Sequence, residues 1–472
     1  MTAVEDYVRS LELDAYVVGG AVRDALLGIE SQDADFLVPG VDIDGLRSAL
    51  APHGQTEELI VAGRPVGVRF FPRDGSVRAR APKGIELAPP RRESSTGPGR
   101  HDFEIVVDPT ATVETDLARR DFTVNAIARR LADDTLVDPY GGRDDLDARI
   151  LRTVSTRSFA EDPLRIVRGL RFISQLGLEP DEHTLAQMRE EAASVAFVSG
   201  ERVGGGLAAD GMGELSKLLL GAEPAKALRV ARDTGVLVAL LPEFERSIGF
   251  DQESRYHDLT VDEHTFAVVQ AAADAGAPLR VRLAALFHDL GKPYVAWRGA
   301  DGRLHYYAKP GHSQRNHEQV SADLAVAALA RLRYPTELRR GVARIVRAHM
   351  IDPGRADPVR ARRLLARHGA SITFDLLDHK EADLRGKRRP GEDVPEADLA
   401  KLARFREVVE QEVASPHRLR DLAIGGDDLL AAGYKPGPAI GQTLRSLLDE
   451  VVTDPSRNTR PVLLKRAQEM LA

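Results

Sequence analysis

The chain has 472 residues, 43% of them hydrophobic, which at roughly 100–200 residues a domain is enough for two to four domains with ordinary cores. A net charge of −7 argues against a protein that coats nucleic acid over its whole surface, although a local basic cluster is compatible with that total. The absence of cysteine excludes disulfides, thiolate zinc sites and cysteine nucleophiles; with no signal-peptide core and no apolar run of about 20 residues, we expect a soluble cytoplasmic protein with no membrane partner.

The character of the sequence changes near Arg152. Before it, short β-rich runs alternate with turn residues, which predicts a mixed α/β domain with a small sheet. After it, long stretches rich in Ala, Leu and Arg, joined by Gly or Pro, predict helices. The segment Pro89–Arg100 is rich in Pro, Gly, Ser and Arg, and we expect it to form a mobile surface loop between two strands.

A strand, a glycine turn and the start of a helix are predicted over residues 16–28 (YVVGGAVRDALLG). Glycines at such a turn let the backbone approach a phosphate, and the start of the helix supplies N–H donors. Arg23, one turn into the helix, adds a guanidinium suited to charge-assisted hydrogen bonds with the same group. The segment therefore predicts a triphosphate site.

Asp33 and Asp35 stand at the head of the apolar run FLV, which predicts a second strand. On a strand, side chains at i and i+2 project to the same face, so the two carboxylates are placed to clamp divalent metal. Nucleotidyl transfer uses two such ions about 3.5–4 Å apart, and Mg²⁺ prefers oxygen ligands. An isolated Asp-x-Asp is usually a solvated turn, but the glycine turn upstream favours a catalytic pair that holds Mg²⁺.

The sequence GGAVRDALLG followed by DADF resembles the class II CCA-adding enzyme and bacterial poly(A) polymerase family of the polymerase-β superfamily. The resemblance implies that Asp33 and Asp35 are catalytic and hold the metal ions. Related enzymes of the superfamily use a third carboxylate from a neighbouring strand. The sequence leaves Glu86 and Glu104 both open for that role.

The same resemblance assigns nucleotide contacts in the head. It implies that Gly20 and Arg23 bind the nucleotide phosphates. Further along, RRDFTVNA resembles a motif of the family, which implies that Arg120 contacts the nucleotide and that Asp121 and Asn125 help to recognise the ribose.

In the stretch EDPLRIVRGLR, one acidic and three basic side chains recur every third residue and line one face of a predicted helix: Asp162, Arg165, Arg168 and Arg171. Cytosine and adenine both present an amino donor beside a ring-nitrogen acceptor, which suits a carboxylate beside a guanidinium. Uracil and guanine present a carbonyl beside an N–H, so neither the carboxylate nor the guanidinium would find its matching partner. The motif therefore predicts selection of C and A without a nucleic-acid template, and a solvated, salt-bridged helix face is the alternative.

In the family, the matching aspartate and first arginine serve as the protein template for the incoming base. The resemblance implies these roles for Asp162 and Arg165, with Arg168 and Arg171 as further nucleotide contacts. Ser199–Val203 and Glu214–Leu219 resemble the neck helix of the family.

A second constellation lies further along the predicted helices, with the order His…His-Asp…His…His…Asp. Imidazoles and carboxylates suit Mg, Mn, Ni, Fe or Zn ions. The pattern resembles an HD phosphohydrolase domain, which implies four metal ligands: His264, His288, Asp289 and Asp383. His317 and His349 are additional candidates, and a structural or regulatory role for the domain in place of hydrolysis stays open.

The expected fold is α+β, with a small polymerase-β-like nucleotidyltransferase head of mixed sheet followed by all-α neck, HD and tail domains. The expected boundaries are 1–152 for the head, 153–250 for the neck, 251–390 for the HD domain and 391–472 for a tail that binds tRNA. The resemblance implies addition of C, C and A to the tRNA 3′ end from CTP and ATP. A poly(A) polymerase, a CC- or A-adding enzyme, and an HD phosphohydrolase as the main activity stay open, as do a monomer and a homodimer.

Overall fold

The computed structural model describes residues 2–29, 35–61, 63–95, 103–205, 211–253, 258–309, 315–387 and 396–471. The chain forms two compact units, one of Met1–Pro242 with Arg331–Tyr334 and the other of Glu243–Ala330 with Pro335–Ala472. Among the described residues, no helix is long and apolar enough to cross a membrane.

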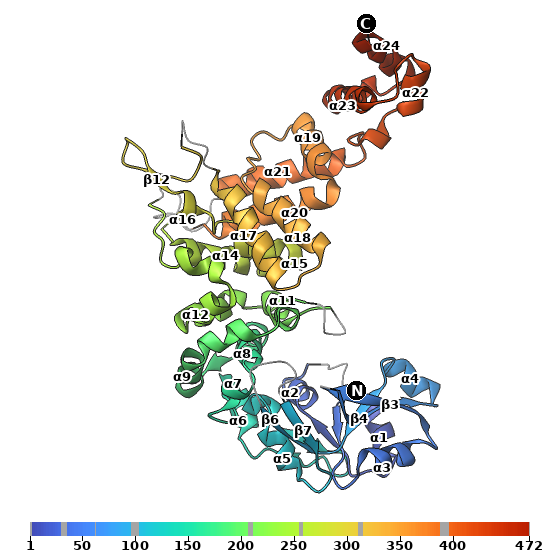
Figure 1. Ribbon diagram of the computed structural model, residues 1–472, viewed down its shortest axis with the longest axis vertical. Helices are drawn as coiled ribbons and strands as arrows, with labels where there is room; N and C mark the ends of the chain where they lie inside the picture. Colours follow the sequence, from blue (N-terminus) through green and yellow to red (C-terminus); the bar gives the residue numbers. More distant parts are fainter. Residues whose placement is uncertain are drawn as a thin grey trace. The chain divides into compact units, whose positions relative to one another are not determined.

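A seven-stranded sheet lies at the centre of the N-terminal part of the first unit (Figure 1). Its strands are β1 (Tyr16–Val18), β2 (Asp35–Leu37), β3 (Gly54–Val61), β4 (Arg64–Pro72), β5 (Ile85–Ala88), β8 (Ala128–Arg130) and β9 (Leu136–Val137). Their order is β3-β4-β5-β2-β1-β8-β9, with β2 and β5 parallel and the other neighbours antiparallel. The mixed sheet predicted for the head is confirmed.

Both faces of this sheet are buried at β1 and β2. Successive side chains on a strand point to opposite faces, so neighbouring apolar residues enter cores on opposite sides of the sheet. Val17 and Phe36 belong to one apolar core, and Val18 and Leu37 belong to another. The helices that contribute to these cores are α1 (Thr2–Arg9), α2 (Gly20–Leu26), α3 (Ile43–Leu50), α4 (Gly75–Arg80) and α5 (Val113–Ala118). Asp35 is exposed at the start of the otherwise buried β2, so the sheet holds a carboxylate firmly at a point open to ligands.

The segment predicted as a mobile loop contains a strand. Arg91–Ser95 forms β6, which pairs antiparallel with β7 (Phe103–Val107). The prediction is therefore wrong for these five residues, because the backbone ladder with β7 stabilises an extended conformation that the local composition does not favour. Residues 96–100 of the predicted loop lie outside the described residues.

The neck is built around one long helix, α8 (Leu164–Leu176). It packs against α11 (Glu214–Leu219) and α12 (Pro224–Asp233). Apolar residues of α8 such as Ile166, Val167 and Leu170 are fully buried, whereas Arg165, Arg168 and Arg171 line a cavity on the side of the head. Two short elements, α6 (Gly142–Asp147) and β10 (Ile150–Leu151), end the head. The rest of the neck contains α7 (Ser158–Glu161), α9 (Glu182–Glu190), α10 (Gly200–Val203), α13 (Val236–Leu240) and β11 (Glu179–Pro180), which pairs with β10.

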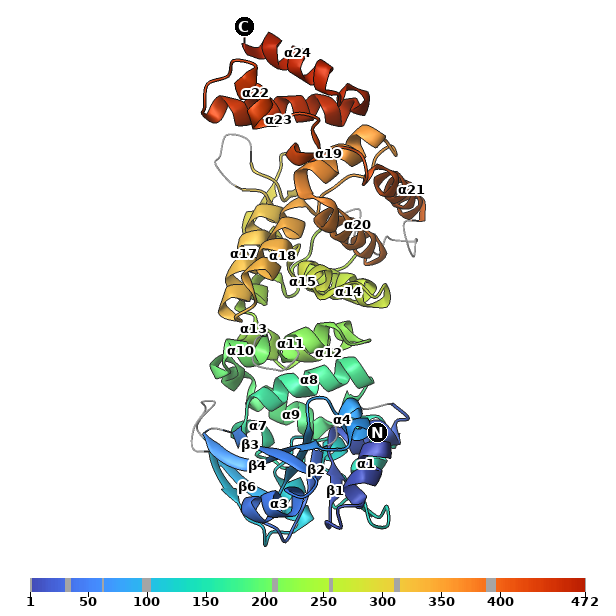
Figure 2. The ribbon, with the colours of Figure 1, turned by 90° about the vertical axis from the view of Figure 1, so that its right-hand side faces the viewer.

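The second unit is a helical bundle with one short hairpin, β12 (Trp297–Arg298) and β13 (Leu304–His305) (Figures 1 and 2). Its helices are α14 (Val261–Asp274), α15 (Leu279–Phe287), α16 (Lys292–Val295), α17 (His317–Arg331), α18 (Thr336–Ala348), α19 (Pro358–His368), α20 (Ala370–Arg385) and α21 (Glu396–Glu412). The chain is buried at every position from Val281 to Leu290, which places α15 at the centre of the bundle.

Three final helices form the tail: α22 (Gly426–Ala431), α23 (Pro438–Thr453) and α24 (Arg460–Leu471). They enclose a core of their own, which includes Leu429, Tyr434, Leu447 and Leu463. Helix content after residue 152 agrees with the predicted all-α character, apart from the small strand pairs.

Candidate functional site

A cavity of 520 Å³ lies between the sheet domain and α8 within the first unit. Among its lining residues, arginines outnumber carboxylates by eight to three, so the cavity is strongly positive and suits a polyanion such as a triphosphate. Its lining includes Gly20, Arg23, Asp35, Arg91, Arg119, Arg120, Asp121, Asn125, Asp162, Arg165, Arg168, Arg171, Phe172 and Arg202. All the predicted nucleotide-binding residues are in this set.

The turn after β1 brings a guanidinium against the backbone. Gly19 has φ +70°, and a Cβ added to it would lie 2.4 Å from Nη1 of Arg120. The glycine therefore gives the turn its left-handed conformation and leaves room for Arg120. Arg23 follows on α2 (Gly20–Leu26), where its Nη1 donates to Oδ1 of Asn125 at 2.7 Å.

Asp35 has a second carboxylate beside it. In the parallel register of β2 and β5, Asp35 lies opposite Glu86, and both line an adjoining cavity of 360 Å³. Glu86 also pairs with Arg69 at 2.6 Å. Glu104 lies on β7, which pairs with β6, so of the two candidates for a third carboxylate it is Glu86 that stands next to Asp35. Asp33 lies outside the described residues.

The arginines that follow α5 are held by a buried anion. Asp116 is completely buried and pairs with Arg119 at 2.6 Å and with Arg120 at 3.1 Å. Burial by itself raises the pKa of Asp116, but the two guanidinium groups outweigh it and leave the pKa below its ordinary value. Asp116 thus stays ionised and fixes the position of Arg120 in the cavity.

A continuous hydrogen-bond network joins the head to the neck. Asn125 Nδ2 donates to Oδ1 of Asp121 at 2.9 Å, and Arg168 Nε donates to Oδ2 of Asp121 at 2.8 Å. Burial opposes ionisation of Asp121, yet Arg168 and Asn125 lower its pKa to about 2. Together with the bond from Arg23, this network orders the polar side of the cavity before any ligand enters.

Two further contacts fix the position of Arg171 on the face of α8 that lines the cavity. Arg171 pairs with Glu214 at 2.9 Å, and its guanidinium carbon lies 4.4 Å from the ring centroid of Phe172. Burial lowers the pKa of Arg171 to about 10, with Glu214 offsetting part of the effect. Arg171 is nonetheless a cation at neutral pH, held by an ion pair and an aromatic ring.

The two predicted base-selecting residues, Asp162 and Arg165, are held by contacts with different segments of the chain. Arg202 of α10 pairs with Asp162 at 2.9 Å. Arg165 donates through Nη2 to the carbonyl of Arg119 at 2.7 Å and through Nη1 to the carbonyl of Ser158 at 3.2 Å. Both side chains line the same cavity. Arg202 was not predicted as part of the site, because it lies 40 residues from its partner and its only local signal is the basic residue in SGERV.

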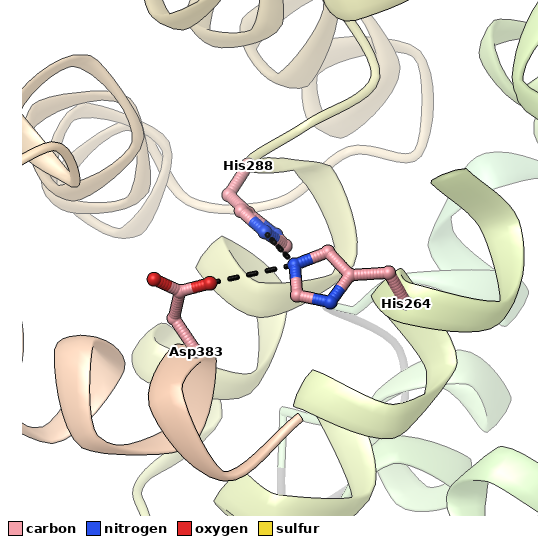
Figure 3. Close-up of side chains that lie close together, drawn as sticks. All are labelled: His264, His288 and Asp383. Atoms are coloured by element: carbon pink, nitrogen blue, oxygen red, sulfur yellow. Dashed lines mark hydrogen bonds and ion pairs between the residues drawn. The ribbon is translucent and has the colours of Figure 1, made fainter. Parts of the chain in front are cut away.

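A second candidate site lies within the helical bundle of the second unit. His264 from α14, His288 at the end of α15 and Asp383 from α20 point toward one another (Figure 3). Nε2 of His264 lies 3.3 Å from Nε2 of His288 and 3.4 Å from Oδ1 of Asp383. These three buried side chains offer one ligand atom each within 4.8 Å, which suits a metal ion.

Asp289 connects this cluster to a second one. Its Oδ2 lies 3.2 Å from Nε2 of His288 and 3.5 Å from Nε2 of His264. Its Oδ1 lies 3.6 Å from Nε2 of His317 and 3.7 Å from Nε2 of His349. Asp289, His317 and His349 form a buried group with the spacing of metal ligands in their own right. The structure therefore brings all six predicted or additional ligands together around a shared carboxylate.

The chemistry of this donor set fits divalent metal. Burial lowers the pKa of His264 and lowers that of His349 well below its ordinary value, so these rings are neutral and have a lone pair to donate. The two carboxylates stay ionised: burial opposes this, but His288 and Lys292 hold the pKa of Asp289 well below its usual range, and Lys387 and Lys380 do the same for Asp383.

One buried histidine near this site, His379, was not predicted from the sequence. His379 of α20 lies one helical turn before Asp383, with its ring centroid 5.1 Å from that of His288 and 5.8 Å from that of His349. The i, i+4 spacing of His379 and Asp383 in DHKEAD was the available signal.

Matches to protein families follow the division of the chain. A Poly A polymerase head domain matches residues 15–152, an HD domain matches residues 261–403, and a model for domain 2 of tRNA nucleotidyltransferases matches residues 404–467. A further model, for an RNA and SrmB-binding site of polymerase A, matches residues 177–248.

Curated relatives extend over nearly the whole chain. A multifunctional CCA protein of Methylococcus capsulatus is 35% identical over 463 residues, which cover 91% of this chain and 98% of the relative. A multifunctional CCA protein of Azoarcus sp. is 40% identical over 341 residues, which cover 71% of this chain and 73% of the relative.

Solved structures share the fold. A CCA-adding enzyme of Bacillus stearothermophilus in complex with CTP aligns with a TM-score of 0.69 at 22% identity, covering 99% of this chain and 96% of that one. A Thermotoga maritima CCA-adding enzyme complexed with tRNA aligns with a TM-score of 0.58 at 20% identity, covering 100% and 94%. These findings confirm the predicted resemblance and the predicted fold class. Because it is 35% identical to one relative over 98% of that relative's length, the chain belongs to the family of multifunctional CCA proteins.

Proposed function

We propose that this enzyme adds C, C and A to the 3′ end of tRNA, using CTP and ATP and no nucleic-acid template. The observation that carries the proposal is that one positive cavity collects Asp35, the phosphate-binding arginines and the pair Asp162 and Arg165. Membership of the multifunctional CCA protein family favours this output over poly(A) synthesis or partial CC or A addition.

The catalytic carboxylates are Asp33 and Asp35, with Glu86 as the third. Asp35 and Glu86 lie on adjacent parallel strands in matching register, which supports a shared role. We propose Mg²⁺ as the ion, since carboxylate oxygens are its preferred ligands; when bound, it activates the attacking hydroxyl and stabilises the leaving oxygen. The residues themselves fix the positions of these oxygens through the rigid sheet.

The triphosphate is held by Gly20, Arg23 and Arg120, with Arg168 and Arg171 as further contacts. Ion pairs to Asp116, Asp121 and Glu214 hold Arg120, Arg168 and Arg171 in place before the nucleotide binds. Such preorganisation reduces the entropy lost on binding. We assign recognition of the ribose to Asp121 and Asn125, which this network orients.

The incoming base is read by Asp162 and Arg165. The carboxylate accepts from the exocyclic amino group, and the guanidinium donates to the ring nitrogen. The ion pair with Arg202 orients Asp162, while the carbonyls of Arg119 and Ser158 orient Arg165. C and A satisfy both groups, whereas U and G do not.

The proposal is tested with tRNA transcripts that lack the terminal CCA. The purified protein is incubated with CTP alone, ATP alone and both, and the products are resolved to single nucleotides. Growth by three residues followed by arrest is expected when both nucleotides are present. Long A tails, or growth by one kind of nucleotide only, would show that a narrower activity of the family is the correct one.

Replacing Asp162 by alanine is expected to reduce kcat/KM for CTP and ATP by about 10- to 100-fold, the cost of losing one good hydrogen-bonded base contact. The rate with UTP is expected to change little, because uracil offers no amino group to this carboxylate. Single-turnover incorporation of each nucleotide measures the change. Glu182→Ala removes an exposed carboxylate of the same neck and is the matched control. Equal losses for CTP and UTP would contradict a role in base selection.

We propose a second activity, metal-dependent hydrolysis of phosphate esters, at the HD site. Two buried clusters joined by Asp289 support it, since pairs of metal ions recur in phosphatases. We assign one ion to His264, His288 and Asp383 and another to His317 and His349, with Asp289 shared, and leave the choice among Mg, Mn, Ni, Fe and Zn to measurement. Bound metal there supplies Lewis-acid polarisation of the phosphate and an activated water.

The remaining assignments are proposals of the same kind. The tail, residues 391–472, binds tRNA, in keeping with the family model that matches residues 404–467. Boundaries near residues 152, 250 and 390, a cytoplasmic location and a monomer or homodimer stay predictions.

A further inference from the structure

Four residues from the helical second half of the chain belong to the first unit. The segment Arg331–Tyr334 connects α17 to α18, which otherwise belong to the second unit, yet it lies within the first unit. It also falls inside the region that the HD domain model matches. The first unit is therefore completed by a segment that the HD part of the chain supplies.

This segment lies directly against both ends of α10. A Cβ added to Gly200, the first residue of the helix, would lie 2.3 Å from the carbonyl oxygen of Arg331. A Cβ added to Gly204, the residue after the helix, would lie 2.2 Å from the carbonyl oxygen of Leu332. Backbone oxygens cannot swing aside as the end of a flexible side chain does, so glycine is needed at both positions for this close approach. The segment therefore fixes where α10 lies.

Buried hydrogen bonds add a second link between the segment and the same helix. The hydroxyl oxygens of Tyr334 and Ser216 are hydrogen-bonded at 2.9 Å, and Ser216 Oγ donates to the carbonyl of Gly204 at 2.8 Å. Both side chains are buried, so water does not readily replace a lost partner. Because Ser216 belongs to α11, Tyr334 connects the segment to α11 as well as to the end of α10.

The two helices held in this way carry partners of nucleotide-site residues. Arg202 of α10 pairs with Asp162 at 2.9 Å, and Glu214 of α11 pairs with Arg171 at 2.9 Å. A helix of four residues such as α10 is too short to be stable by itself. The geometry of the pair between Arg202 and Asp162 therefore depends on what packs against α10.

We infer that the segment Arg331–Tyr334 is a positioning element for base selection, which holds α10 in place and, through Arg202, orients the carboxylate of Asp162 toward the incoming base. The inference rests on the proposed function, in which Asp162 and Arg165 read the base. Tyr334 is not among the described residues that line the nucleotide cavity, so it acts through other residues. A small displacement of Asp162 weakens its hydrogen bond to the amino group of C or A, whereas U has no amino group to lose. Loosening the segment therefore lowers discrimination between CTP and UTP.

Tyr334→Phe removes one hydroxyl and keeps the ring. We expect it to reduce the ratio of kcat/KM for CTP to kcat/KM for UTP by about 3- to 10-fold, the usual effect of losing one hydrogen bond. Gly200→Ala, whose Cβ would meet the backbone of the segment, is expected to reduce the ratio at least as much. Single-turnover incorporation of each nucleotide into tRNA that lacks the terminal CCA measures both variants of the full-length protein.

Each variant has a matched control. Gly75→Ala also changes the first residue of a short helix in the same unit, but nothing lies within 4 Å of the added Cβ. Tyr306→Phe removes a hydroxyl that donates to the carbonyl of Gln252 at 2.6 Å in the second unit. Both controls are expected to leave the ratio for CTP and UTP unchanged.

Combination with Asp162→Ala separates this inference from the function on which it rests. If the segment acts through Asp162, then Asp162→Ala alone lowers the ratio for CTP and UTP, and Tyr334→Phe lowers it no further in that variant. An unchanged ratio in both Tyr334→Phe and Gly200→Ala, or a further loss of the ratio when Tyr334→Phe is added to Asp162→Ala, overturns the positioning role and leaves base reading by Asp162 standing. Equal slowing of CTP and UTP incorporation by Asp162→Ala overturns base reading, and the inference with it.

Discussion

Replacing Asp35 by alanine is expected to reduce nucleotide addition to tRNA by about 1000-fold or more, because the substitution removes a ligand that fixes charge where it develops in the transition state. Asp35 is exposed at the start of β2, so the variant loses no core packing and is expected to fold normally. Asp33→Ala is expected to behave in the same way. The measurement is a single-turnover rate of CMP incorporation at saturating CTP and Mg²⁺.

The matched control is Glu57→Ala, which removes an exposed carboxylate of β3 in the same sheet. It is expected to leave the rate within twofold of the native one. CTP binding by Asp35→Ala, measured by calorimetry, is expected to persist, since the arginines that hold the triphosphate are intact. If Asp35→Ala kept more than about a tenth of the native rate, the assignment of the catalytic carboxylates would be wrong.

Replacing Asp289 by alanine is expected to remove both metal ions from the HD site and to reduce phosphate release by about 1000-fold or more. One carboxylate lies within 3.7 Å of four imidazoles, so its loss deprives both clusters of an anionic ligand and leaves Lys292 without its ion-pair partner. Metal content after equilibrium dialysis and phosphate release measure the two effects. Nucleotide addition is expected to stay within twofold of the native rate.

Asp274→Ala, at the exposed end of α14, controls for loss of a carboxylate from the same unit. Circular dichroism of Asp289→Ala checks that the bundle is intact. Retention of the native metal content would refute the ligand role of Asp289, and a parallel loss of nucleotide addition would indicate that the variant is misfolded rather than demetallated.

Residues within a short motif could be predicted from the sequence more readily than the distant residues that pair with them and hold them in place. The motifs used for the prediction each span about a dozen residues or fewer: GGAVRDALLG, DADF and EDPLRIVRGLR. The expectation of a CCA-adding nucleotidyltransferase with an HD domain is confirmed by the family to which the chain belongs. Arg202 and Glu214 reach their partners Asp162 and Arg171 across about 40 residues of chain. Such contacts depend on how α10 and α11 pack near α8, which no local pattern records.

The prediction of a loop over Pro89–Arg100 was wrong for part of that segment, and the reason is related. Composition favours disorder when a segment is considered alone, but Arg91–Ser95 is stabilised by its ladder with Phe103–Val107. Similarly, the resemblance to an HD domain implied that Asp289 is a ligand, whereas its position between two clusters depends on four other helices, α14, α17, α18 and α20. Residue type and order gave the candidate donors, and only tertiary packing places one of them between the two clusters.

In the proposed two-ion arrangement, the sharing of Asp289 makes the second site vulnerable to a minimal change. An asparagine has nearly the same shape but one oxygen instead of two, so it would offer an acceptor to the ligands near Oδ2 or to those near Oδ1, and not to both. A single-nucleotide mutation of the gene would then convert the proposed paired centre into a half-site, and it would also remove the carboxylate with which the buried Lys292 pairs. Descendants of such a protein would keep every histidine of the motif and would have lost the partner ion in one step.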